Sequence, residues 1–291
     1  MVNVRMTFWR RFWFGLCAVA LTHSAVAQNY QGKELVRATI LADTSAIVPG
    51  KPFAVGVLLR MAPDWHTYWK FSGDAGLPTE IKWNLAPGWK VGEIQWPIPL
   101  KTNDPGDIQT YGYQDEVMLI QEITPPSTID NSPVKLSAQV DWLVCERICI
   151  PGGATLTLEL PTKTSAEPKN TDLFARYRRL LPQKFPDANT ASVTWSRTGN
   201  NLHLKVTGDQ IANYQAIDFF PVSQSNDIIV GHPSVESPDK SLSSMPGLIV
   251  FAQHENGNDR QGWEISPAQT VPAAKIPQST PSPIESSIRT E

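Results

Sequence analysis

Two cysteines four positions apart, Cys145 and Cys149, are the residues of this chain whose type and spacing best suit chemistry. The third cysteine, Cys17, lies in an N-terminal segment with the features of an export signal. Two thiols this close can form a short structural disulfide, alternate between dithiol and disulfide, or ligate a soft ion such as Cu(I). The function of the chain depends on which of these three the pair does.

The first 27 residues have the features of an export signal. A positively charged start is followed by an apolar run too short to span a bilayer and by a small-x-small cleavage site. These parts are Arg5, Arg10 and Arg11, residues 12–21, and Ala25-Val26-Ala27 before Gln28. We expect cleavage after Ala27, which removes Cys17; an uncleaved membrane anchor is the alternative. In an oxidising exported compartment, the remaining two cysteines form a disulfide at some stage.

Length and charge narrow the class of protein. Removing three arginines and no acidic residue with the signal lowers the formal net charge from −3 to −6. A mildly acidic chain without a basic run is a poor partner for nucleic acid or an anionic membrane surface. No later stretch reaches the ~18 consecutive apolar residues of a transmembrane helix, so no membrane span is expected in the mature chain. About 260 residues suffice for two β-sandwiches, and cores of that size do not need a disulfide to fold.

Most of the chain is typical of short strands between Gly and Pro turns. Residues 34–41 alternate in period two, and residues 53–60 form an apolar, β-branched run. The strands expected in the first region are 34–41, 53–60, 80–83, 93–96, 116–123, 134–143 and 154–160. This spacing, without a long helical pattern, predicts an all-β fold that begins with an antiparallel sandwich.

A helix and a second β region are expected to follow. Residues 171–181 place apolar side chains at helical spacing, with Thr171 as N-cap and Pro182 as the stop. The strands expected after this helix are 202–206, 216–220, 228–230, 248–252 and 262–265. The predicted parts are a signal peptide (1–27), a first β domain (28–162), a linker with a helix (163–185), a second, smaller β domain (186–270) and a disordered Pro/Ser-rich tail (271–291).

If Cys145 and Cys149 are bonded, the chain between them must turn. In an extended strand their Cα atoms would lie about 13 Å apart, at roughly 3.3 Å per residue, whereas a disulfide requires about 4.4–6.8 Å. The segment Pro151-Gly152-Gly153 is typical of a turn-forming neighbourhood. We therefore expect the pair where a strand ending near Val144 turns back toward the next strand at Ala154, at an exposed tip that suits thiol exchange.

A passive disulfide and a metal site are the alternatives to a redox pair. Closing a five-residue loop removes only about 2 kcal/mol of unfolded-state entropy, against about 4.7 for a 100-residue loop, so a staple stabilises little here. The spacing is not the Cys-x-x-Cys of thioredoxin-like proteins, and no βαβ pattern surrounds it. We predict no resident metal or cofactor, because the further ligands of a metal site do not cluster near the pair. Those ligands would have to be a Met, His66, His203, His232 or His254.

Several motifs resemble the periplasmic N-terminal domain of DsbD-type thiol:disulfide interchange proteins, and in particular their ScsB-like branch. The first is the segment Trp142-Leu143-Val144-Cys145 followed by Cys149-Ile150-Pro151-Gly152. The others are Trp65-His66-Thr67-Tyr68-Trp69, Gly73-Asp74-Ala75-Gly76-Leu77-Pro78-Thr79, Ile94-Gln95-Trp96-Pro97 and Tyr111-Gly112-Tyr113. They occur in the same order over roughly residues 35–160. The region from Asp218-Phe219-Phe220-Pro221 to about Thr270 also resembles the β region that follows in that branch.

The resemblance implies an immunoglobulin-like sandwich whose cysteines cycle between dithiol and disulfide. It implies electrons arriving from a thioredoxin-like domain and leaving for periplasmic substrates, such as disulfide isomerases and cytochrome c maturation factors. By position, Tyr111 and Gly112, with Thr110 and Tyr113 beside them, match the loop that caps the cysteines in the family; ordinary strand-end packing is the alternative for the two tyrosines. His66 is interpreted as structural.

The predicted function is therefore periplasmic thiol–disulfide exchange through Cys145 and Cys149. The chain shows neither the membrane domain nor the thioredoxin-like domain of the full-length family members. We accordingly expect a separate thioredoxin-like or membrane protein as electron donor and disulfide-bearing periplasmic proteins as acceptors. The alternative is a non-enzymatic exported module that binds a protein or copper and carries a passive disulfide.

Overall fold

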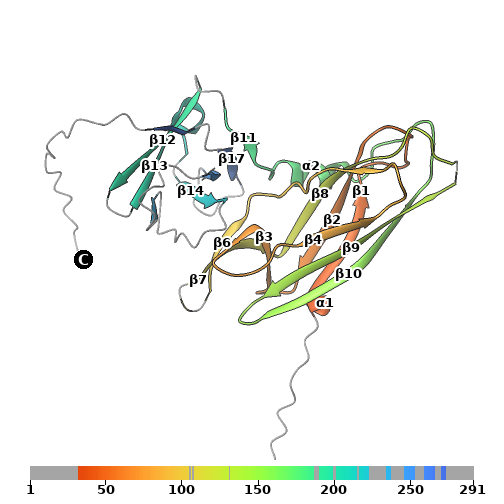
Figure 1. The fold of residues 1–291 in the computed structure, drawn as a ribbon, viewed down its shortest axis with the longest axis horizontal. Coiled ribbons are helices and arrows are strands. Elements are labelled where there is room, and N and C mark those ends of the chain that lie inside the picture. The colour runs from red at the N-terminus through yellow and green to blue at the C-terminus, as the bar shows by residue number, and fades with distance from the viewer. Residues whose placement is uncertain are drawn as a thin grey trace, which may run out of the picture. The chain divides into compact units, whose positions relative to one another are not determined.

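A computed structural model describes residues 32–104, 106, 108–130, 132–186, 190–198, 201–214, 216–222, 234–236, 246–252, 259–265 and 270–272. All of these belong to one compact unit (Figure 1). The predicted export signal, the strand predicted at 228–230, His232, His254 and the tail from residue 273 onward lie outside the described residues. None of the helices in the described ranges is long and apolar enough to cross a membrane.

The first β region consists of two antiparallel sheets. A short helix, α1 (Gly32–Leu35), precedes the first strand. The first sheet has the order β1 (Val36–Ala42), β2 (Phe53–Met61), β8 (Glu116–Thr124), β5 (Lys90–Val91). The second has the order β10 (Cys149–Leu160), β9 (Val134–Cys145), β3 (His66–Gly73), β7 (Ile108–Gln114), β6 (Leu100–Asp104), and β4 (Glu80–Asn84) also pairs with β9.

The core lies between these two sheets, and the alternation of β9 shows how it forms. Every second residue of this strand, from Leu136 to Val144, is buried, whereas those between are partly exposed. The four buried residues from Ala138 to Val144 pack in one cluster with Val57 and Leu119 of the first sheet. We call this side of the second sheet its inner face. Because successive side chains of a strand point to opposite faces, Cys145 lies on the outer face.

Helix α2 (Thr171–Arg178) covers the other side of the first sheet. Its buried residues Phe174 and Tyr177 pack against Leu58 of β2 and Met118 of β8. This packing explains why residues 53–59 are apolar without alternation, since β2 is buried on both faces. The helix ends at Arg178 rather than 181, and Asn170 rather than Thr171 is its N-cap.

The second β region contains two further sheets. One has the order β11 (Gln183–Lys184), β17 (Gln261–Ile265), β16 (Gly247–Ala252), β14 (Ala216–Pro221). The other has the order β15 (Ser234–Glu236), β13 (Asn201–Gly208), β12 (Ala191–Thr198), β18 (Thr270–Pro272), and a 3₁₀ turn, η1 (Asp209–Ile211), follows β13. The all-β prediction is confirmed.

Two further local predictions were wrong. Residues 93–96 are not a strand: Gln95 makes only an isolated bridge with Ile120, and the prolines that follow at 97 and 99 have no amide hydrogen to extend a ladder. The return strand begins at Cys149 rather than Ala154, so Pro151-Gly152-Gly153 belongs to β10 and not to a turn. The edge position of β10 tolerates the proline.

Gly152 shows why small residues are needed in that strand. A Cβ at Gly152 would lie 2.5 Å from Nε1 of Trp142, which donates a hydrogen bond to the carbonyl of Gly32 at 3.2 Å. The glycine is required by close packing across the sheet edge rather than by a turn.

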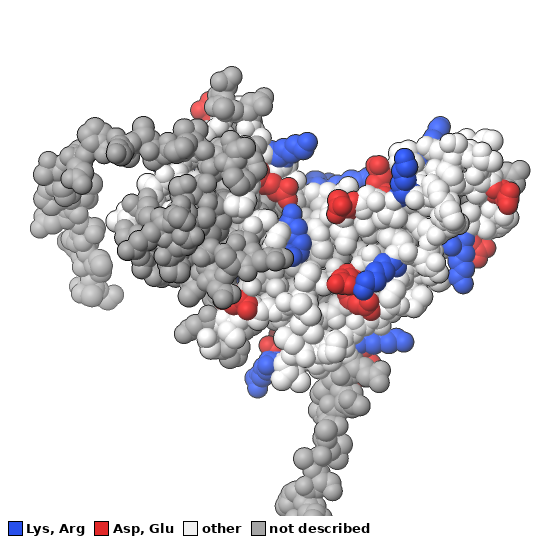
Figure 2. Space-filling model, viewed as in Figure 1, with Lys and Arg blue, Asp and Glu red and all other residues white. Residues whose placement is uncertain are grey.

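Charged side chains of both signs are interspersed over the visible face of the molecule (Figure 2). Among the described residues, several charged side chains form ion pairs, such as Lys82 with Glu80 at 2.6 Å and Arg178 with Asp43 at 2.8 Å. This face therefore presents a mixed surface, without a block of one sign.

Candidate redox site at the cysteine hairpin

The cysteine pair closes the hairpin between β9 and β10. Cys145 ends one strand, Cys149 begins the next, and the two are direct partners in the ladder. They are joined by a disulfide with their Cα atoms 4.2 Å apart. The turn predicted between them is confirmed, and residues 146–148 form it. The two residues differ in environment, because Cys145 is 3% exposed and Cys149 is open to solvent.

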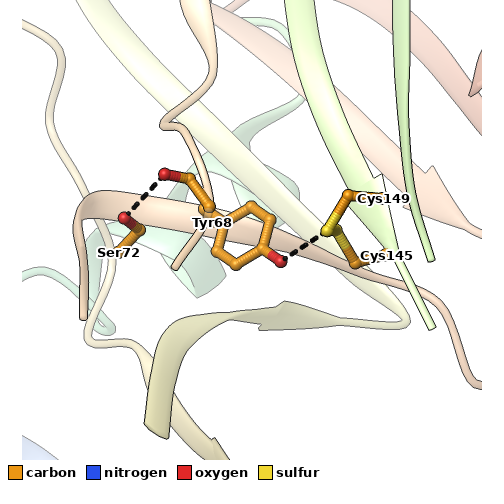
Figure 3. The surroundings of a disulfide bond; sticks show 5 residues. Tyr68, Ser72, Cys145 and Cys149 are labelled. Atoms are coloured by element: carbon orange, nitrogen blue, oxygen red, sulfur yellow. Dashed lines mark hydrogen bonds between the residues drawn. A yellow bond between two sulfur atoms is a disulfide. The ribbon is translucent and has the colours of Figure 1, made fainter. Parts of the chain in front are cut away.

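Strand β3 brings two further side chains to the pair. His66 is the ladder partner of Cys145, so their side chains share the outer face, and Tyr68, two residues on, lies on that face as well. The hydroxyl of Tyr68 lies 3.4 Å from Sγ of Cys149 (Figure 3). In the disulfide the sulfur carries no proton, so the tyrosine is the donor. The ring of His66 packs edge-on against Tyr68 at 5.2 Å.

A glycine-containing loop, residues 73–78, covers Tyr68, which is 1% exposed. Gly76 sits directly on the ring: a Cβ there would lie 2.2 Å from Cε1 of Tyr68. The loop is held by Ser72, whose hydroxyl donates to the carbonyl of Gly76 at 3.0 Å, and by Asp74, whose carboxylate accepts from the amide of Gln109 at 2.8 Å. The tyrosine is thus fixed between this loop and the disulfide.

The hairpin tip presents apolar surface next to the exposed sulfur. Ile148, the residue before Cys149, is 61% exposed, and Leu77 in the loop over Tyr68 is 65% exposed. The charges of the tip, Glu146 and Arg147, face each other at 3.8 Å and are both exposed.

The predicted cap residues lie on β7. The alternation of this strand places Thr110 and Gly112 on the outer face with Tyr68, the ladder partner of Gly112. Tyr111 and Tyr113 are on the inner face, where the hydroxyl of Tyr113 donates to the carbonyl of Pro97 at 2.7 Å.

Both tyrosines of this segment are buried, which decides their protonation. Burial, followed by the charges of Asp74 and Asp218, raises the pKa of Tyr111 well above its usual value. Burial likewise raises the pKa of Tyr113. Both therefore remain protonated phenols at neutral pH. A capping role for Thr110, Tyr111, Gly112 and Tyr113 stays a prediction.

The residue that sequence reasoning did not assign to the site is Tyr68. It was noted only as part of the motif Trp65-His66-Thr67-Tyr68-Trp69, and it is separated from Cys149 by 81 positions. No local pattern signals a contact across that distance. Among the described residues, no group of three or more His, Cys, Asp or Glu side chains could hold a metal ion.

The arrangement allows thiol–disulfide chemistry. Cys149 is the exposed residue of the pair, and Cys145 is close enough to re-form the disulfide with it. After reduction, the hydroxyl of Tyr68 can donate to the Cys149 thiolate and so stabilise the reactive form.

Comparisons with known proteins found a matching family model and similar solved structures. Residues 36–161 match the family model described as the N-terminal part of the thiol:disulfide interchange protein DsbD. The solved N-terminal periplasmic domain of ScsB from Proteus mirabilis is similar, with 16% identity, coverage of 81% of this chain and 95% of that chain, and a TM-score of 0.56. The reduced N-terminal domain of DsbD from Neisseria meningitidis matches with 14% identity, 49% and 96% coverage, and a TM-score of 0.29. No curated protein matches the sequence.

Proposed function

Residues 36–161 belong to the DsbD-type N-terminal domain family, and from this premise we propose that the chain is a periplasmic thiol–disulfide exchange protein. The observation that supports the proposal is the pairing of an exposed Cys149 with a buried Cys145, with the hydroxyl of Tyr68 directed at the sulfur of Cys149. A passive disulfide has no need of an exposed cysteine or of a hydrogen-bond donor directed at its sulfur.

The exchange proceeds through a mixed disulfide. The Cys149 thiolate of the reduced protein attacks one sulfur of a partner disulfide, and the partner's other sulfur leaves as a thiolate that takes up a proton. The Cys145 thiol loses its proton and attacks the Cys149 sulfur, which releases the partner as a dithiol. Two electrons have then moved to the partner, and Cys145 and Cys149 are again a disulfide. We propose Cys149 as the attacking residue and Cys145 as the resolving one, because Cys149 is exposed and Cys145 is buried.

The proposed partners follow from this cycle. A donor dithiol, on a separate thioredoxin-like or membrane protein, reduces the Cys145–Cys149 disulfide. The acceptors are periplasmic proteins with a disulfide, in the family disulfide isomerases and cytochrome c maturation factors. We propose that the chain reaches that compartment by cleavage after Ala27, in keeping with the description of the similar ScsB domain as periplasmic.

Trapping of a mixed disulfide tests the assignment of roles. The reduced Cys145→Ser variant should form a stable mixed disulfide with oxidised glutathione through Cys149, detected by intact mass. The Cys149→Ser variant is the matched control and should react far more slowly, because its remaining thiol is buried. Equal reactivity of the two variants would contradict the assignment. Both should stay folded, since the short loop contributes only about 2 kcal/mol.

The reduction potential of the pair separates exchange from a passive disulfide. We expect a value within about −120 to −270 mV, the span of known exchange proteins, measured by alkylation across a graded redox buffer. A value below about −300 mV would favour the binding module with an inert bridge.

A further inference from the structure

Two successive residues of strand β3 make contacts on opposite faces of the sheet. Tyr68 lies on the outer face, against Cys149, and Trp69 follows it on the inner face. The ring of Trp69 packs edge-on against Phe220 of β14, in the second β region, at 6.0 Å. The strand that holds the tyrosine on the disulfide is therefore itself held by a residue about 150 positions further along the chain.

Phe220 is enclosed by residues from three strands of the second sheet. Besides Trp69 of β3, it contacts Tyr111 of β7 edge-on at 5.1 Å, and the ammonium group of Lys101 on β6 lies 5.2 Å from its ring centre. Its exposed fraction is 0%. A fully buried ring with neighbours on three strands restrains their relative positions, because protein interiors are close-packed and tolerate little displacement.

Two ion pairs also join strands of the second sheet to the second β region. Lys101 is bonded to Asp218, which lies two residues before Phe220, and both side chains are mostly buried. Lys70, the residue after Trp69, pairs with Glu264 of β17 at 2.9 Å. Each restrains a position beside one of the aromatic contacts, so β3 and β6 are both attached to the second β region.

We propose that the second β region is a positioning element of the redox site. Phe220 holds β3 and β7 from the inner face, and this keeps Tyr68 in place over Cys149 on the outer face. The consequence for thiol–disulfide exchange rests on the function proposed above. The effect of Phe220 on the position of Tyr68 does not depend on that function. Phe220 acts through Trp69 and Tyr111 and is a positioning residue, not a catalytic one.

The test is the reactivity of the Cys149 thiolate in the intact, reduced protein. Phe220→Leu removes the ring contacts and keeps an apolar side chain. The alkylation rate of Cys149 by iodoacetamide is measured at the high-pH plateau, where the thiol is fully ionised, by mass spectrometry of its peptide. We expect a rise of about threefold, because a thiolate that loses the hydrogen bond of Tyr68 has a pKa about one unit higher, and the nucleophilicity of a thiolate rises with its pKa.

Phe251→Leu is the matched control. Phe251 is equally buried in the second β region, but its ring contacts are Trp263 at 4.4 Å and Tyr214 at 5.4 Å, within that region. It should leave the alkylation rate within about twofold of the wild type while lowering stability by a similar amount. If the two variants raise the rate equally, or neither does, the positioning role is wrong.

A second pair of variants keeps the test decisive if Phe220→Leu does not fold. Lys101→Met removes the ion pair at the interface, and Lys82→Met removes an exposed pair with Glu80 elsewhere in the first region. Only Lys101→Met should speed alkylation of Cys149, and equal rates would overturn the proposal. Neither measurement needs a partner protein, so a failure of glutathione trapping would count against the exchange function alone.

Discussion

At the scale of single residues, the two sulfurs of the pair occupy different environments. Cys145 is buried at the end of a strand, whereas Cys149 is exposed. The sulfur of Cys149 lies 3.4 Å from the hydroxyl oxygen of Tyr68. A phenol that donates to a sulfur stabilises the thiolate more than the thiol, because hydrogen bonds to charged groups are the stronger ones. Tyr68 is therefore expected to activate Cys149 rather than only to cover it.

Removal of that hydroxyl should weaken the activation. In Tyr68→Phe, the pKa of the Cys149 thiol should rise by about one unit, which corresponds to about 1.4 kcal/mol and to the loss of one bond to a charged group. The pH dependence of iodoacetamide alkylation measures this value. Tyr113→Phe is the control, because that hydroxyl is also buried but bonds to Pro97 on the opposite face. An unchanged thiol pKa in Tyr68→Phe would refute the role.

At the scale of elements, the loop 73–78 and the strand β3 act as one structure. The loop follows directly from the strand and folds back over it, with Gly76 against the ring of Tyr68 and an isolated bridge between Tyr68 and Pro78. The fold back is possible because Gly73 and Gly76 adopt positive φ, a region that side chains with a Cβ avoid.

Gly76→Ala should displace this loop. The backbone is at φ +101°, and the new methyl group would overlap the Tyr68 ring, so we expect a loss of stability of about 1–3 kcal/mol and faster alkylation of Cys149. Denaturant unfolding and alkylation rates measure the two effects. Gly106→Ala is matched in backbone conformation, at φ +93°, but has nothing within 4 Å. Backbone strain should lower the stability of Gly106→Ala without changing the alkylation rate of Cys149. Equal alkylation rates in the two variants would exclude the contact with Tyr68 as the cause.

At the scale of the whole molecule, charged groups attach helix α2 to the first sheet. Glu116 of β8 is bonded to Arg176 of the helix and, at 3.1 Å, to Arg60 of β2. Burial by itself raises the pKa of the Glu116 carboxyl, but the bonds and charge of Arg176, with further bonds from Tyr177 and Arg60, outweigh it and lower the pKa below 4.5. The folded state therefore favours the carboxylate.

This pKa shift predicts a pH-dependent effect of Glu116→Gln. A lowered folded-state pKa stabilises the protein above the usual glutamate value, and the effect is lost as the pH falls through the folded value. At pH 7 we expect the variant to be less stable by up to about 1 kcal/mol, because the partners are half exposed, and at pH 2.5 the difference should vanish. Urea unfolding at both values measures it, and a difference that persists at pH 2.5 would contradict the electrostatic origin.

The sequence by itself determined the features that depend on neighbouring residues. The four-residue spacing required a turn if Cys145 and Cys149 are bonded, and the pattern of short runs between turns predicted a strand at residues 134–143, where the structure has β9. Both follow from local chain geometry, in which the period of the side chains and the reach of a disulfide are fixed. The motifs spread over residues 35–160 carried the resemblance to the DsbD-type N-terminal domain, whose family model matches residues 36–161.

Only the tertiary structure decided which distant residues meet at the site. Tyr68 reaches Cys149 because the ladder places His66 opposite Cys145, and a shift of one residue would turn Tyr68 to the other face. The packing of α2 on β2 and of Phe220 between Trp69 and Tyr111 likewise depends on how whole elements stack. Such contacts arise from the burial of apolar surface across long sequence separations, which no local pattern encodes.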